Sequence, residues 1–289
     1  MNFGLFRISR RSIIAAAALL GLVPLGLGAH AALNKRPLHA APAVEAGQPA
    51  DARGTPARLA LVIGNGHYPD AGAPLPQPIN DARALTATLR RDGFDVDVVE
   101  DASRDDIDRA IARLKARITP QAVVMLYFGG FGIQAGRESY MIPVDAVIWR
   151  EADVHRSGVS IDAVLAAIAQ QGAEVKLAVI DASRRNPYER RFRGFSHGLA
   201  PIEPPDNALA LSAATPGKVA DDSSAPNSVL MTELLRALAL PGGAEAAFTS
   251  TRTAVMRATE GAQVPVLSSS LRGEVGFGRA EASAAGPGE

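Results

Sequence analysis

Four short, continuous apolar runs most constrain the fold of this chain. Such runs, without alternating polar residues, are typical of strands buried on both faces of a sheet. They are "RLALVIGN" (Arg58–Asn65), "AVVMLYFG" (Ala122–Gly129), "VKLAVID" (Val175–Asp181) and "ALALSAA" (Ala208–Ala214). A strand with two buried faces needs a layer of helices on each side. The runs therefore predict an α/β fold with a mostly parallel sheet.

Segments with helical spacing of apolar residues alternate with these runs, as expected for a parallel sheet. Ser103 and Ser160 each precede such a segment and are expected to be N-caps, and Asn80 is interpreted as the N-cap of the first helix. The expected helices cover about residues 81–91, 103–118, 160–169, 228–240 and 244–258. The loops after the strands are where such sheets place their functional sites.

The N-terminus carries the pattern of an export signal. Arginines precede an apolar run from Ile13 to Leu27, and small residues follow, so residues 1–31 are interpreted as a secretory signal peptide. The stretch "SRRSII" resembles a twin-arginine signal. The alternative is an uncleaved membrane anchor, although Pro24 and the short apolar core argue against a span of ~20 residues. Both interpretations predict an exported protein, periplasmic or secreted, that contacts a membrane only if the segment is retained.

One folded body is expected at residues 58–278. Residues 32–57 are rich in Ala, Pro and Gly and lack periodicity, so they are interpreted as a disordered linker, and the Ala/Gly-rich residues 279–289 are interpreted as a disordered tail. The formal net charge is zero, so nothing indicates binding to nucleic acid. A cluster of arginines follows the third apolar run and is interpreted as a solvated loop. It consists of Arg184, Arg185, Arg190, Arg191 and Arg193.

The chain contains no cysteine. Disulfides, thiolate metal ligands and a thiol nucleophile are therefore excluded. The five histidines show no metal-ligand spacing, and nothing in the sequence requires a cofactor or a metal.

An ordered series of motifs runs through the body from about Arg58 to Phe277. It opens with "ALVIGNGHYPDAGAPLPQPINDARALTATLRRDGFDV" and continues through "LYFGGFGIQAGRESYMIPVDA", "LAVIDASRRNPY", "GLAPI", "NSVLMTELL" and "QVPVLSSSLRGEVGF". Together the motifs resemble the bacterial caspase-like peptidases, the metacaspase and orthocaspase group of peptidase C14. The resemblance implies a caspase-like three-layer α/β/α sandwich, with a large portion of about 58–200 and a small portion of about 201–278. It also implies cysteine-type endopeptidase activity, with cleavage after Arg or Lys.

Both reactive residues of this family are replaced. The resemblance implies a histidine in a Gly-His-Gly pattern and a cysteine in an Asp-Ala-Cys-Arg pattern. In this chain "GGFGIQ" places Phe131 at the histidine position, and "DASRR" places Ser183 at the cysteine position. The two positions lie 52 residues apart, close to the spacing of about 50 in caspases. We therefore predict a degenerate, inactive catalytic pair.

The replacements remove the chemistry of peptide hydrolysis. A cysteine thiol ionises readily near neutral pH, whereas a serine hydroxyl needs a base within hydrogen-bond reach. Phe131 can neither accept nor donate a proton. The expected protein is a pseudo-peptidase that binds a peptide or protein segment containing Arg or Lys without cutting it. Two alternatives stay open: a serine-type hydrolase in which His67 or His197 is the base for Ser183, and an inert structural or anchoring module.

Acidic residues and glycines around this pair are the predicted ligand-binding residues. By resemblance, Asp81 and Asp181 stand where family members accept a basic side chain, while Gly130 and Gly132 imply close backbone approach and donors for an oxyanion. The aspartates also have structural interpretations. Asp81 would lie in the first turn of a helix, and Asp181 could accept backbone N–H groups in a turn. Family members often bind calcium, but the acidic residues of "ADDSS" are too isolated for us to predict a site.

Overall fold

The computed structural model describes residues 56–69, 74–185, 187, 198–220 and 224–277. The predicted signal peptide, the tail and almost all of the linker therefore lie outside the described residues. His197 and three of the clustered arginines (Arg190, Arg191 and Arg193) also lie outside them. Within the described ranges, no helix has the length and apolar character needed to span a membrane.

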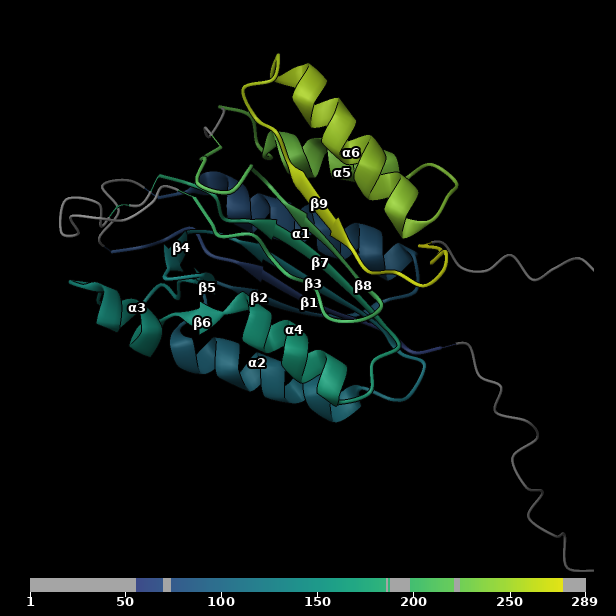
Figure 1. Ribbon diagram of the computed structural model, residues 1–289, viewed down its shortest axis with the longest axis horizontal. Coiled ribbons are helices and arrows are strands. Elements are labelled where there is room, and N and C mark those ends of the chain that lie inside the picture. The colour runs from purple at the N-terminus through teal and green to yellow at the C-terminus, as the bar shows by residue number, and fades with distance from the viewer. Residues whose placement is uncertain (1–55, 70–73, 186, 188–197, 221–223, 278–289) are drawn as a thin grey trace, which may run out of the picture. The chain divides into compact units, whose positions relative to one another are not determined.

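The part of the chain that the structure describes forms one central six-stranded sheet, in the order β2-β1-β3-β7-β8-β9 (Figure 1). Five strands are mutually parallel, and the last strand pairs antiparallel with β8, as the prediction of a mostly parallel sheet requires. The strands are β1 (Arg58–Gly64), β2 (Asp95–Glu100), β3 (Val123–Gly129), β7 (Val175–Asp181), β8 (Ala208–Ser212) and β9 (Val266–Ser269).

Helices cover both faces of this sheet (Figure 1). One layer contains α1 (Pro76–Arg91), α5 (Val229–Leu238) and α6 (Ala244–Ala258), and the other contains α2 (Arg104–Arg117) and α4 (Ile161–Gln170). Alternate residues of each strand point to opposite layers. In β1, Val62 packs with the first layer, and Leu61 and Ile63 pack with the second. The three-layer α/β/α sandwich predicted from the sequence is therefore confirmed, as are the N-caps Ser103 and Ser160.

A second, three-stranded antiparallel sheet follows β3. It contains β4 (Gly132–Ala135), β5 (Glu138–Met141) and β6 (Val159–Ser160), with α3 (Glu151–Ser157) between β5 and β6. Its apolar side chains form a separate cluster with Tyr68 and Phe131. The cluster therefore lies directly beside the end of β3.

The start of α1 differs from the sequence prediction. The helix begins at Pro76, five residues earlier than expected, with Leu75 rather than Asn80 as its N-cap. Pro76 and Pro78 are tolerated because the first N–H groups of a helix have no partner within the helix. Asp81 consequently lies in the second turn and is buried. The interpretation of Asp81 as a first-turn carboxylate was wrong, because the prolines were interpreted as a loop.

Candidate functional site

The ends of β3 and β7 hold the two predicted reactive positions next to each other. The strands are paired up to Gly129 and Asp181. Beyond that point, Gly130 N–H donates to the carbonyl of Asp181 at 3.2 Å, and Gly132 N–H donates to the carbonyl of Ala182 at 2.9 Å. The segments that carry Phe131 and Ser183 are therefore hydrogen-bonded neighbours.

Phe131 is part of an apolar cluster. Its side chain is 5% exposed and packs edge-on against Tyr68, with ring centroids 4.8 Å apart. The backbone N–H of Phe131 donates to the Tyr68 hydroxyl at 3.1 Å, and that hydroxyl donates to the carbonyl of Ile142 at 2.9 Å. The position predicted from the sequence to correspond to a catalytic histidine thus holds an aromatic ring that packs in the apolar cluster beside the small sheet.

Ser183 is buried, and no described residue is bonded to its hydroxyl as a base. The residue is 1% exposed, and its Oγ makes no hydrogen bond to any described residue. His67 directs its Nδ1 to Asp101 Oδ2, 2.6 Å away, and its side chain is 65% exposed. His67 is therefore not hydrogen-bonded to Ser183, and His197 lies outside the described residues.

The burial of Ser183 leads to a stability prediction. A buried hydroxyl without a partner costs about 1–3 kcal/mol of desolvation. We therefore expect Ser183→Ala to leave the free energy of unfolding unchanged or to raise it by about 1 kcal/mol, measured by urea denaturation. Ser228→Ala is the matched control, because the Ser228 hydroxyl caps α5 by accepting from Met231 N–H at 3.0 Å. The control should lose about 1 kcal/mol. A comparable loss in Ser183→Ala would show that its hydroxyl is bonded.

Asp81 reaches the same end of the sheet from α1. One carboxylate oxygen accepts from Asn227 Nδ2 at 2.8 Å and from the backbone N–H of Ser228 at 3.1 Å. Burial, and next the negative charge of Asp181, raise the pKa of Asp81 to about 7, although the bonds from Asn227 and Ser228 oppose this shift. The two predicted acidic residues therefore come together, and the charge of Asp181 affects the ionisation of Asp81.

Among the described residues, Arg184 is the cation that lies at Asp181. Its side chain is 3% exposed, and Nη1 lies 3.4 Å from Asp181 Oδ1. Nη1 also donates to the carbonyl of Gly130 at 3.1 Å and to the carbonyl of Asp181. The prediction of a solvated arginine cluster is therefore wrong for Arg184, whereas its neighbour Arg185 is exposed. The Asp181 carboxylate accepts no backbone N–H from the described residues, so its contacts do not match the expected turn.

Tyr127 is a residue of the site that sequence reasoning missed. Its hydroxyl is fully buried and has no hydrogen-bond partner in the described ranges. Burial, and next the charges of Asp81 and Asp181, raise the pKa of Tyr127, while the charge of Arg184 opposes them. The available signal was a single hydroxyl in the otherwise apolar run that forms β3. The Oδ2 atom of Asp181 is also buried and makes no hydrogen bond to a described residue.

The backbone between β3 and β4 is closely packed, as its glycines predicted. A Cβ at Gly130, where φ is +156°, would lie 2.5 Å from the Tyr68 hydroxyl, and a Cβ at Gly132 would lie 2.7 Å from Leu199 Cδ2. The N–H groups of residues 130, 131 and 132 all donate within the protein. An oxyanion could bind to them only if these hydrogen bonds were exchanged.

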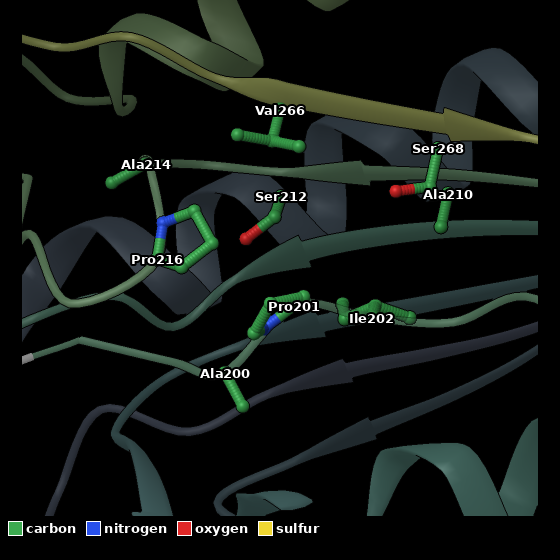
Figure 2. A pocket seen from close by; sticks show the side chains of 9 residues that line it. All are labelled: Ala200, Pro201, Ile202, Ala210, Ser212, Ala214, Pro216, Val266 and Ser268. Atoms are coloured by element: carbon green, nitrogen blue, oxygen red, sulfur yellow. The ribbon is translucent and has the colours of Figure 1, made fainter. Parts of the chain in front are cut away.

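A separate cavity lies near the carboxyl end of β8. It is small, with a volume of about 10 Å³, and is lined by side chains from residues 200–202, β8, β9 and the loop after β8 (Figure 2). The residues are Ala200, Pro201, Ile202, Ala210, Ser212, Ala214, Pro216, Val266 and Ser268. None of these is charged, so the cavity is not suited to a basic side chain.

Among the described residues, no group of three or more His, Asp or Glu side chains could hold a metal ion.

Comparisons with known proteins agree with this architecture. A family model described as "Caspase domain" matches residues 57–275. Among solved structures, the crystal structure of protein GSU0716 from Geobacter sulfurreducens is similar, with a TM-score of 0.55 and 18% sequence identity. The match covers 74% of this chain and 93% of that chain, and it supports the fold alone. A search of curated proteins gave no match.

Proposed function

This chain belongs to the caspase domain family of peptidase C14, and we propose that it is a pseudo-peptidase. It binds a polypeptide by accepting a Lys or Arg side chain of that polypeptide, and it does not cut it. The observation that carries the proposal is the pair of Phe131 and Ser183. The first is packed in an apolar cluster, and the second is buried with no base bonded to its hydroxyl among the residues that the structure describes. Peptide hydrolysis by serine requires a base within hydrogen-bond reach.

The acidic side chains supply the proposed recognition. Asp81 and Asp181 lie together at the carboxyl ends of the strands, where α/β sheets place ligands. The donors to Asp81, the Asn227 amide and the Ser228 backbone N–H, are uncharged. A buried carboxylate without a cation is costly, so a Lys or Arg side chain of a ligand would be favoured there. The export signal predicted at residues 1–31 supports action in the periplasm or outside the cell.

The proposal is tested by measuring cleavage and binding on the same purified protein. Cleavage of fluorogenic peptides that end in Arg or Lys, with and without calcium, should not exceed the background of the Ser183→Ala variant. Fluorescence anisotropy with a labelled peptide ending in Arg should show binding. Asp181→Asn should weaken it about tenfold or more, because a charge-assisted bond contributes about 1.5–3 kcal/mol. Asp108→Asn, an exposed residue of α2, is the control.

Two outcomes would contradict the proposal. Turnover that Ser183→Ala abolishes would establish a serine-type hydrolase, the first alternative from the sequence. Affinity that is unchanged in both Asp81→Asn and Asp181→Asn would indicate an inert module, or binding at another surface.

A further inference from the structure

The acidic site, formed by Asp81 and Asp181, already holds a basic side chain from this chain itself. The guanidinium of Arg184 lies at the Asp181 carboxylate, and it also donates to two backbone carbonyls, those of Gly130 and Asp181. These acceptors suit a guanidinium, which offers several N–H donors in a fixed plane. The buried Tyr127 hydroxyl also senses these charges: the charges of Asp81 and Asp181 raise its pKa, and the charge of Arg184 opposes that shift.

Arg184 itself lies outside the regular elements, and its side chain is held by bonds to Asp181 and Gly130. Residues 182–185 belong to no helix or strand, and the next residue, Arg185, is exposed. The Arg184 side chain can therefore leave the site by rotating about its own bonds, without disrupting a strand. A tethered group competes for its site at an effective concentration of roughly millimolar or more.

We propose that Arg184 is an internal ligand of the acidic site, which a basic side chain of an incoming polypeptide must displace in order to bind. This inference rests on the proposed function and deepens it, because it names how access to the same site is controlled. Arg184 keeps Asp181 paired when no ligand is bound. A ligand can bind only to the fraction of molecules in which Arg184 has left the site, so the apparent affinity is the intrinsic affinity multiplied by that fraction.

The test compares Arg184→Ala with Arg185→Ala, which removes an adjacent but exposed arginine. Anisotropy with the labelled peptide ending in Arg should show about tenfold or greater tightening in Arg184→Ala, as expected when an occupant of more than nine-tenths of the sites is removed. Arg185→Ala should bind like the wild type. Measurable wild-type binding that is unchanged or weaker in Arg184→Ala would overturn the inference, while leaving the proposed function intact.

A second measurement separates the inference from the proposed function. Millimolar methylguanidinium should raise the melting temperature of Arg184→Ala but not that of the wild type or of Arg185→Ala, because only the first variant has a vacated acidic site. Such a rise without peptide binding in any variant would support Arg184 as an internal ligand and refute the proposed function. No rise and no tightening would overturn the inference. If Arg184→Ala fails to fold, Arg184→Gln removes the charge and keeps an amide donor for the carbonyls.

Discussion

Restoring both reactive side chains, as Phe131→His together with Ser183→Cys, is expected to produce a protein that cleaves peptides after Arg or Lys. The backbone frame for this pair is in place, because Gly130 and Gly132 hold the two segments together by hydrogen bonds to residues 181 and 182. Loss of a single member of a catalytic set costs about 10⁴ to 10⁶ in rate. We therefore expect the initial rate to rise about 10³-fold or more above the wild-type background.

The single variants are the controls for this experiment. Ser183→Cys alone supplies a thiol without a base and should stay near background. Phe131→His alone supplies a base to the weaker serine nucleophile, so its rate should stay well below that of the double variant. Adding Arg184→Ala to the double variant should raise the rate further at low substrate concentration, because the internal arginine no longer competes. A folded triple variant that binds the peptide but does not cleave it would show that the frame does not align a peptide bond with residue 183.

The sequence was sufficient to predict the layers of the fold. Continuous apolar runs such as Leu59–Ile63 can be buried only between two helical layers, and the N-caps Ser103 and Ser160 mark where two of the helices begin. Motif order placed Phe131 and Ser183 after two of the predicted strands, and these strands are parallel neighbours whose carboxyl ends lie at one edge of the sheet. These features depend on periodicity and register, which a sequence records directly.

The direction of individual polar side chains was not predictable in the same way. Arg184 and Arg185 are adjacent in a loop, yet the first is buried and the second is exposed. A loop has no repeating geometry from which the inward residue could be read. The inward arginine is fixed by acceptors distant in the sequence, such as the carbonyl of Gly130. The burial of Asp81 likewise depended on where α1 begins, and two prolines obscured that point.

The ionisation of Asp81 leads to the largest expected effect on stability. A carboxyl group whose pKa is about 7 in the folded protein and 3.8 in a model compound binds more protons when folded than when unfolded between these values. Its contribution to stability is therefore present at low pH and is lost as the pH rises from about 4 to about 7. The loss approaches at most about 4 kcal/mol above that window.

Asp81→Asn should remove this loss, because the amide cannot ionise and its oxygen can still accept the hydrogen bonds from Asn227 and Ser228. At pH 8 we expect the variant to unfold with a free energy about 2–4 kcal/mol higher than the wild type, and at pH 4 with a similar one. Urea denaturation across this range measures the difference, with Asp108→Asn as the exposed control. A wild-type and an Asp81→Asn profile of equal slope would assign the pH dependence to another group. A steeper fall of the unfolding free energy with pH in the variant would mean that the negative charge on Asp81 stabilises the fold through a cation at the acidic site.

Asp181→Asn tests the effect of Asp181 on Asp81, because removing that neighbouring charge should lower the pKa of Asp81 and shift the loss of stability to lower pH.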